Sequence, residues 1–547
     1  VMTLLLLLLV SSVAALPTGK QPSPKPNVLF LMSDSFDGRV LDPTSPVSQR
    51  VRTPFLTQLA SEGTNFVRMY SNSPQCVPSR TSMFTGRHTH EIKCWNNGQG
   101  VAMTPKGTVD PACAQWWSEA QCKEWGPQQN VTATLVDSLE AGGVFPHLYG
   151  KVDVGAGIIE RMGEDNATVD GFHGGPSPQI LTRAANIRKP TKDDPDAITN
   201  DKDNNVHPED WKTIAKCLDF LEGKSPSDDP WFLYCSVNIP HPPFRTNDTW
   251  LEYVNESAIN VPQWLDEQDF HPADAYMSQS KDVWRTFTDD DILKVRKTYY
   301  AMCAETSYML GLVYERAKAR GLVDNTYVVF VSDHGEMNME HRQVWKNSMY
   351  EASSRVPMVI SGPNIPKGKV VSTLVSLLDV YPTLLDMVTA PHPSFLQGYS
   401  LLPLAMGHRQ SRPDYIVSQY HSNMGNTGSF MIRQGPWKYI AFGNTLPAYK
   451  NYEPQLFDVD TDPEELKDVA ASTPDVASRL DGLLRSVVDY QVVDKEVKLQ
   501  DAALFHKFMY DGKSQKTVKS EMSKGYIGYD AADNKLLESW LGEVNRL

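Results

Sequence analysis

Continuous apolar runs, each followed by polar residues, mark the strands that we expect at the centre of the fold. A strand that is apolar at consecutive positions is buried on both faces, as in a parallel sheet. Such runs occupy residues 27–33, 144–149, 231–237, 326–332 and 356–361. Helical stretches separate them, at 54–63, 132–141, 207–223 and 290–321. This alternation predicts an α/β fold whose doubly wound sheet is sandwiched between helices.

The pattern changes after about residue 400. Short strands separated by turns are expected at 415–420, 430–433, 437–442 and 455–458, with a terminal helix at 476–488. Such spacing is typical of an antiparallel sheet. We therefore predict a main domain over 27–400 and a smaller C-terminal antiparallel-sheet subdomain over 401–547.

The first residues resemble a secretory signal peptide, which we place at 1–16. Residues 2–15 are almost free of polar side chains and end in small residues. The run is too short to span a bilayer, and no later segment has 18 uncharged apolar residues. Four acceptor triplets for N-glycosylation agree with this route: Asn130, Asn166, Asn247 and Asn255. We expect a lysosomal or secreted glycoprotein with no membrane span in the mature chain.

Composition excludes one class of partner. The net charge of −14 and the pI near 5.4 argue against a nucleic-acid-binding protein, which needs a basic face. An acidic chain also suits an acidic compartment, where protonation reduces its charge. Among the seven cysteines, Cys94, Cys113 and Cys122 crowd an irregular insertion at 91–127, so we expect at least one local disulfide there. We expect Cys303, in an apolar helix, to be a buried thiol.

Cys76 lies where a strand predicted at 65–70 gives way to a short helix predicted at 79–85. Free N–H groups and the dipole at a helix N-terminus favour an anion, and Arg80 adds a planar set of donors. A nucleophile beside such donors suits attack on a sulfate or phosphate ester. The alternative on physical grounds is that Cys76 is a buried or disulfide-bonded cysteine.

Other candidate residues follow the predicted strands, at the edge of the sheet where ligands bind. Asp34 and Asp333 end two strands and His334 comes next, so these three side chains could hold one cation. Lys151 ends another strand, where it is either a solvated charge or a cation for an anionic group. His241 lies between prolines after a fourth strand, which favours a functional role over a core position.

Together these residues resemble the sulfatase family. Cys76-Val77-Pro78-Ser79-Arg80 matches its Cys-x-Pro-Ser-Arg motif. The other elements follow in the family's order over about 27–470: Asp34, Gly150-Lys151, Pro240-His241, the run 332–336, and His341 with Lys346. The resemblance implies an alkaline-phosphatase-like fold with its catalytic domain at 27–400. Within the family, segments 33–39, 299–306 and 348–353 most resemble a lysosomal enzyme that removes 2-O-sulfate from glucuronate in glycosaminoglycans.

The resemblance also implies the nucleophile and the cofactor. A formylglycine-generating enzyme of the secretory pathway would oxidise Cys76 to an aldehyde, whose hydrated form attacks sulfur. Arg80 would steady that group. One calcium ion would act as a Lewis acid, held by Asp34, Cys76, Asp333 and His334. Calcium or magnesium is favoured over zinc because the ligands are rich in oxygen.

For the substrate, the resemblance assigns Lys151, His241 and Lys346 to the sulfate, with His241 or Lys346 protonating the leaving oxygen. A sulfated glycosaminoglycan oligosaccharide also carries a ring carboxylate. Three residues beyond the Cys76 helix are candidates for binding it, or are merely solvated: Arg87, His88 and His90. We expect turnover to be fastest near pH 5, where exposed histidines are protonated.

Two positions depart from the family's pattern. Most sulfatases have two adjacent acids after the first strand, whereas Ser35 follows Asp34 here, so either fewer carboxylates hold the metal or Asp37 reaches in. The usual Gly-Lys-x-His ends in Asp153, and whether that acid replaces the histidine is open. One alternative is another glycosaminoglycan or aryl sulfatase, such as one that acts on 2-sulfated iduronate. Two others are a phosphodiester or phosphonate hydrolase of the same superfamily and a glycan-binding protein without catalysis, and the motif residues argue against these two.

Overall fold

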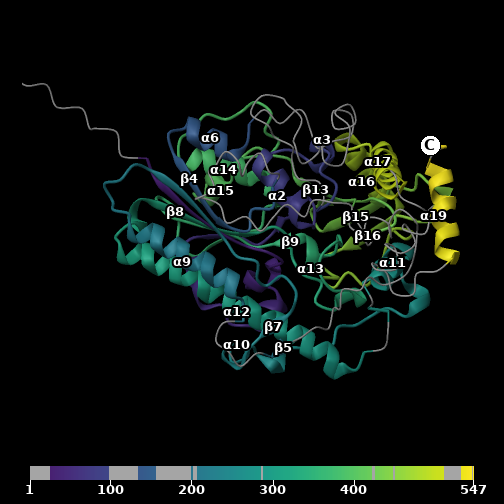
Figure 1. Cartoon of the computed structure of the whole chain (residues 1–547), viewed down its shortest axis with the longest axis horizontal. Coiled ribbons are helices and arrows are strands. Elements are labelled where there is room, and N and C mark those ends of the chain that lie inside the picture. The colour runs from purple at the N-terminus through teal and green to yellow at the C-terminus, as the bar shows by residue number, and fades with distance from the viewer. Residues whose placement is uncertain are drawn as a thin grey trace, which may run out of the picture.

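Figure 1 shows the whole chain in a computed structural model. The structure describes residues 25–97, 133–154, 199–200 and 206–547, apart from residues 282, 285, 286, 422–424, 448, 449, 511–530 and 545. Most of the irregular insertion, with Cys113 and Cys122, lies outside this part of the chain. So do two of the glycosylation triplets, those of Asn130 and Asn166.

A seven-stranded sheet forms the centre of the molecule, in the order β11-β2-β10-β8-β1-β6-β4. Its strands are β1 (Asn27–Ser33), β2 (Thr64–Phe66), β4 (Phe145–Gly150), β6 (Trp231–Ser236), β8 (Thr326–Ser332), β10 (Met358–Ser361) and β11 (Lys369–Val371). The strands β8, β1, β6 and β4 are parallel, and every residue of β1, β6 and β8 is buried, as the apolar runs predict. β10 runs antiparallel to both β8 and β2, so the sheet is mixed.

The strand expected at 356–361 divides into two. Arg355–Val356 (β9) pairs with β3 (Met69–Tyr70) in a second sheet, whose order is β12-β3-β9 with β12 at Val375–Ser376. Only Met358–Ser361 joins the central sheet. Pro357 separates the two pieces, and a proline has no N–H to contribute to a ladder.

Helices cover both faces of the central sheet. One face packs against α1 (Pro54–Glu62), α9 (Pro208–Glu222) and the long α12 (Asp289–Ala319). The other packs against α2 (Cys76–Thr85), α6 (Leu135–Ala141) and α14 (Val380–Met387), with α15 (Leu402–Ala405) beside them. In Figure 1, α9 and α12 lie below the sheet and α6, α14 and α15 above it. This layering confirms the predicted α/β sandwich.

Shorter elements connect these layers. They are α3 (Thr89–Ile92), α10 (Asp248–Leu251), α11 (Pro272–Ser280), α13 (Glu351–Ser354) and the paired β5 (Thr199–Asn200) and β7 (Arg245–Thr246). Among the described residues, none of the helices is both long enough and apolar enough to cross a membrane.

The C-terminal part contains the expected antiparallel sheet, with four strands in sequential order. They are β13 (Tyr415–Tyr420), β14 (Ser429–Gln434), β15 (Trp437–Phe442) and β16 (Gln455–Asp458). The predicted helix is α16 (Pro474–Val487), and α17 (Tyr490–Tyr510) and α19 (Ala531–Val544) follow it, which the sequence pattern did not predict. Buried ion pairs of Glu351 with Arg433 (2.9 Å) and Lys438 (2.8 Å) join this sheet to the main domain. The domain limit at residue 400 stays a prediction.

Candidate active site

Helix α2 begins at Cys76 itself, three residues before the predicted start. The Ser79 N–H already donates to the Gln75 carbonyl (2.9 Å), which closes the first turn. Pro78 sits inside this turn, where its missing N–H breaks no helical hydrogen bond. The Val77 N–H donates to Asn97 Oδ1 (3.1 Å). This turn therefore has fewer free N–H groups for an anion than the sequence suggested, and side chains supply the positive charge around Cys76.

Arg80 is completely buried and its donors face inward. Nε donates to Asp333 Oδ2 (2.7 Å) and Nη2 lies 3.5 Å from Asp34 Oδ2. Nη1 donates to the Lys151 carbonyl (2.7 Å) and to the Tyr234 hydroxyl (2.9 Å). The guanidinium therefore fixes the two acids against the end of the sheet, and few of its donors remain for a substrate.

The register of the sheet brings the two strand-end acids together. Ser33 of β1 lies opposite Ser332 of β8, so Asp34 and Asp333 leave the sheet side by side. Their carboxylates, the Cys76 thiol and the His334 ring each place a ligand atom within 4.8 Å of the others, and all four residues are buried. Cys76 Sγ lies 3.3 Å from His334 Nε2. This group is the metal-ligand set that the sequence resemblance implies.

The orientation of His334 suits a ligand. Its Nδ1 lies 2.9 Å from the Gly335 carbonyl, so Nδ1 carries a hydrogen and Nε2 faces Asp34 and Asp333 (3.5 and 3.7 Å). Gly335 is required at its position, because an added Cβ would lie 2.0 Å from the Ala352 carbonyl oxygen. The His334 carbonyl is held as well, by the hydroxyl of Ser332 (3.0 Å).

Two lysines and a histidine supply the remaining polar groups. Lys151 Nζ lies 2.8 Å from Asp34 Oδ2 and 3.3 Å from Asp153 Oδ2. Lys346 donates to His241 Nε2, while His241 Nδ1 lies 2.5 Å from the Pro242 carbonyl. These two bonds fix His241 as the Nδ1–H tautomer. The structure thus places Lys151, with Asp34 and Asp333, beside the Cys76 group, and pairs His241 with Lys346.

Electrostatics follow from this crowding. Burial is the largest influence on the Cys76 thiol and raises its pKa, but Lys151, Lys346 and His334 outweigh burial and Asp34 and lower it to about 7. Burial also acts most strongly on Asp34, yet Lys151, His241 and His334 hold its pKa well below the ordinary value. Burial first, and then Lys346, lower the pKa of His241 well below its ordinary value.

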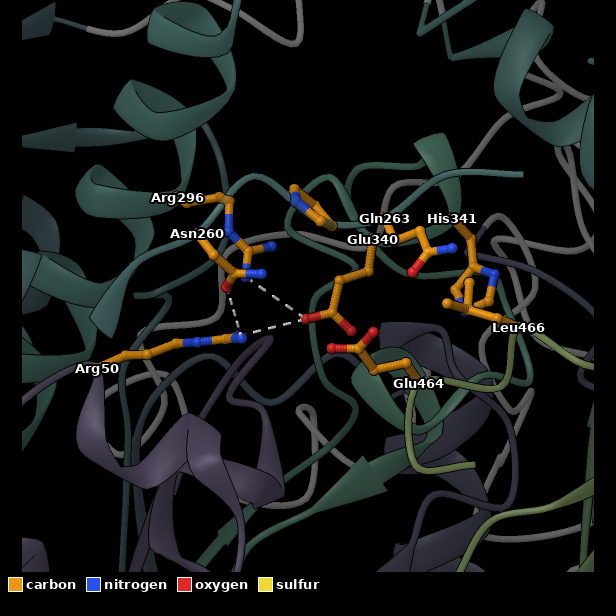
Figure 2. Close-up of a pocket in the computed structure, with 9 residues that line it drawn as sticks. Arg50, Asn260, Gln263, Arg296, Glu340, His341, Glu464 and Leu466 are labelled. Carbon is orange, nitrogen blue, oxygen red and sulfur yellow. Dashed lines mark hydrogen bonds and ion pairs between the residues drawn. The ribbon is translucent and has the colours of Figure 1, made fainter. Parts of the chain in front are cut away.

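Asp37 does not reach the metal-ligand group. Its carboxylate binds Arg39 (2.9 Å), whose other arm pairs with Glu340 (2.9 Å). Figure 2 shows one carboxylate oxygen of Glu340 facing the guanidinium groups of both Arg50 (3.5 Å) and Arg296 (3.8 Å). Asp37 therefore belongs to a buried ion-pair network beside the site, which answers the question that the sequence left open.

Ser35 takes the place of the family's second acid and hydrogen-bonds to both Asp34 and Asp333. Its hydroxyl donates to Asp34 Oδ1 (2.8 Å) and its N–H to Asp333 Oδ1 (3.3 Å). Asp153, in place of the family histidine, is buried and faces Lys151. The loop cations Arg87, His88 and His90 supply no free charge. Arg87 pairs with Glu91 (2.8 Å), His90 Nδ1 accepts from Gln419, and burial, then His90, lower the pKa of His88 to about 4.

Three supporting residues escaped the sequence analysis. Glu336 Oε1 accepts the N–H groups of Asn338 (3.1 Å) and Trp345, so it closes the loop that carries Lys346. Lys281 Nζ donates to the Lys346 carbonyl (2.6 Å). Asp210 accepts the N–H groups of residues 238 and 239 (2.6 and 3.1 Å), just before His241. Glu336 is part of the 332–336 motif, so that motif could have pointed to its role. Lys281 and Asp210 lie far from any motif, so nothing in the sequence pointed to them.

The two described glycosylation triplets differ in exposure. Asn255 is exposed at the surface, whereas Asn247 is buried at the start of α10 and accepts the Trp250 N–H.

His341, which the motif pairs with Lys346, is buried and stacks on Tyr350 with a ring separation of 3.6 Å. Its contacts are those of a packing residue.

Comparisons with known proteins agree with this geometry. The Sulfatase family profile matches residues 26–390, and a profile for the C-terminal part of N-sulphoglucosamine sulphohydrolase matches residues 339–490. The chain is 35% identical to arylsulfatase K of Bos taurus over 510 residues, covering 88% of this chain and 85% of that protein. It is 34% identical to arylsulfatase K of Homo sapiens over 541 residues, covering 92% of each.

Solved structures show the same fold. A phosphonate monoester hydrolase from Silicibacter pomeroyi superposes with a TM-score of 0.63 at 21% identity, over 86% of this chain and 97% of that one. BT1596, described as a 2-O GAG sulfatase, superposes with a TM-score of 0.61 at 20% identity, over 85% and 92%. At such low sequence identities, the similarity to these structures is evidence for the fold only. The profile and the curated relatives, together with the buried Asp-Cys-Asp-His group, establish that the chain belongs to the sulfatase family of sulfate ester hydrolases.

Proposed function

We propose that this sulfatase removes the 2-O-sulfate of glucuronate from glycosaminoglycan oligosaccharides, with formylglycine at Cys76 as its nucleophile. The observation that carries the chemistry is the buried Asp34, Cys76, Asp333 and His334 group at the start of α2. Similarity to arylsulfatase K supports the choice of sugar. The same similarity supports a secretory route ending in the lysosome or outside the cell, with a formylglycine-generating enzyme acting on Cys76 during maturation.

The donor set fits one calcium ion. Two carboxylates and an imidazole converge with the Cys76 side chain, which offers oxygen in place of sulfur after conversion. When bound, calcium supplies Lewis-acid polarisation of the sulfate oxygens. Arg80 and Ser35 orient the two carboxylates by the hydrogen bonds described above, so these acids need little rearrangement to bind an ion.

The chain's own cations account for sulfate binding. Lys151 and Lys346 both lie near enough to Cys76 to lower the pKa of its thiol. A tetrahedral anion at this point would meet an ammonium group from the residue after β4 and another from the loop after β8. His241 is the third group, held rigid by its bond to Pro242.

Lys346 is the better candidate for protonating the leaving oxygen. His241 Nε2 accepts a hydrogen bond from Lys346, and burial, then Lys346, hold the pKa of His241 well below the ordinary value, which favours the neutral ring. A neutral ring whose one hydrogen points at a carbonyl has none to give to the sugar oxygen. We therefore propose Lys346 as the group that protonates the leaving oxygen, with His241 orienting its ammonium.

The contacts of the three loop residues that the sequence suggested do not support a role in binding the ring carboxylate. Arg87, His88 and His90 are engaged with neighbours or neutral. The preference for glucuronate therefore rests on the relatives rather than on an assigned cation.

Two measurements test the proposal. Mass analysis of the tryptic peptide 69–80, from protein made with the maturing enzyme, should show the aldehyde at Cys76; only unmodified or disulfide-linked Cys76 in active protein contradicts it. Cys76→Ser should fold but not turn over, because an alcohol cannot release sulfate as a hydrated aldehyde does. Disaccharides with 2-sulfated glucuronate, 2-sulfated iduronate or 6-sulfated glucosamine are then compared at pH 5 and pH 7.5.

We expect 2-sulfated glucuronate at pH 5 to be cleaved fastest. Preference for the glucosamine substrate or for neutral pH would overturn the specific assignment and leave the sulfatase class. A phosphonate monoester belongs in the same panel, because solved phosphonate hydrolases share this fold. Faster cleavage of that compound than of every sulfate ester would overturn the proposed reaction.

A further inference from the structure

Cys217 and Cys235 face each other between a helix and the central sheet. Cys217 lies on the buried side of α9 and Cys235 on β6, and neither has any exposed surface. Their Sγ atoms are 2.6 Å apart, and the structure holds them as two thiols. Both belong to the apolar cluster between this face of the sheet and its helices. Only 18 positions separate them in the sequence.

We propose that Cys217 and Cys235 form a structural disulfide in the mature protein. Each thiol gives up its proton, and the pair gives up two electrons as the sulfur–sulfur bond forms. The oxidant is a disulfide of the oxidising secretory compartment, carried by a protein or a small thiol, which takes both electrons and both protons and becomes two thiols. The proposal rests on the secretory route proposed above, not on the sulfatase reaction.

The bond has to form before the helix closes over the sheet. Exchange proceeds through a thiolate. In the folded chain, burial first, and then the neighbouring Cys235, raise the pKa of Cys217 well above its ordinary value. Buried thiols of this kind are inert, so oxidation belongs to the folding chain, in which a loop of this length closes easily.

The disulfide would act on the part of the fold that positions His241. Asp210, Cys217 and Leu221 lie on the same buried side of α9. Asp210 holds the N–H groups of residues 238 and 239, two residues after β6 ends and just before His241. Joining Cys217 to Cys235 therefore ties α9 to β6 at the base of the loop whose geometry Asp210 sets.

Peptide mapping of the full chain tests this. Protein secreted by cultured animal cells is alkylated in denaturant without reduction and digested with trypsin. The cysteines fall in separate peptides, 217–224 and 225–245, each with one cysteine. We expect the two peptides to be recovered joined, and to separate after reduction. A glycan on Asn255 in the same digest verifies passage through the secretory pathway.

Two variants sharpen the result. Cys217→Ala should leave Cys235 as an alkylated thiol, whereas Cys303→Ala, which removes a buried cysteine of α12, should leave the joined peptides intact. Recovery of both peptides singly and alkylated from glycosylated wild-type protein overturns the proposal. So does either cysteine joined to a different one. The sulfatase assay is independent of this map, so the two proposals fail separately.

Discussion

Replacing Glu305 by glutamine should change how stability depends on pH. Glu305 lies on α12, fully buried, where its carboxylate accepts the Trp211 indole N–H (3.1 Å) and lies 3.6 Å from His207 Nε2. Burial, the largest influence, raises its pKa to about 8, and the neighbouring Asp210 adds to the rise. Burial also lowers the pKa of His207 to about 4. Between pH 5 and pH 7 both groups are therefore neutral, and the contact is no ion pair.

The sign and size follow from linkage. A carboxyl whose pKa is raised on folding stabilises fully below its unfolded value of 4.5, and that stability is lost as pH rises through about 8. At about 1.4 kcal/mol per pKa unit, ionisation costs the folded state roughly 1 kcal/mol at pH 5 and roughly 4 kcal/mol at pH 8. Glutamine keeps the acceptor for Trp211 and cannot ionise. The free energy of unfolding of the variant should therefore exceed that of the wild type by about 1 kcal/mol at pH 5 and by about 4 kcal/mol at pH 8.

Urea unfolding at pH 5, 6.5 and 8 measures this difference. A matched control is Glu209→Gln, which changes an exposed residue of α9 and should alter neither midpoint nor pH dependence. If the free energies of unfolding of Glu305→Gln and wild type differ by the same amount at all three pH values, the reasoning is refuted. The result bears on the proposed location, because a buried neutral carboxyl favours a chain that works in acid.

Three further predictions concern the site. Asp333→Ala removes a proposed metal ligand and the partner of Arg80, and should lower kcat on a sulfate ester by ~10²–10³, measured with the metal content of the same sample. Glu336→Ala should lower kcat because the Lys346 loop loses its central acceptor, whereas Glu336→Gln, which keeps an oxygen there, should retain most activity. Ser35→Asp and Asp153→His should each lower kcat, and the double variant should recover part of the loss. A double variant no better than the product of the singles would refute this coupling.

The strands and the site residues were predictable for one shared reason. β1, β6 and β8 are buried on both faces, and their continuous apolar runs have the length of strands and are too short for typical helices. Because parallel neighbours end at the same edge, Asp34 and Asp333 had to meet once those strands were paired. Position in the sequence therefore predicted that Asp34, Asp333 and His334 could meet, and the family resemblance added Cys76 to this candidate metal-ligand group.

What escaped prediction depends on contacts between distant segments. Pro78 made the helix appear to begin at Ser79, although a proline is tolerated in a first turn. Lys281 reaches the Lys346 loop from a segment with no motif, and Asp210 reaches the His241 loop from α9. Arg87 and His90 looked free in the sequence because their partners, Glu91 and Gln419, depend on the fold.

The two departures from the family pattern compensate each other in charge. Ser35 removes one carboxylate from the metal side, and its hydrogen bonds to Asp34 and Asp333 replace a charged ligand by a neutral support. Asp153 restores a carboxylate, 3.3 Å from the Lys151 ammonium that already contacts Asp34. Lys151 thus contacts both Asp34, beside the position where the family has its second acid, and Asp153, where this chain has an acid instead. Because the site is buried, a lone change at either position leaves a charge unbalanced in a medium of low polarity, whereas the pair of changes keeps the sum. This is why we expect the two substitutions to be tolerated together better than singly.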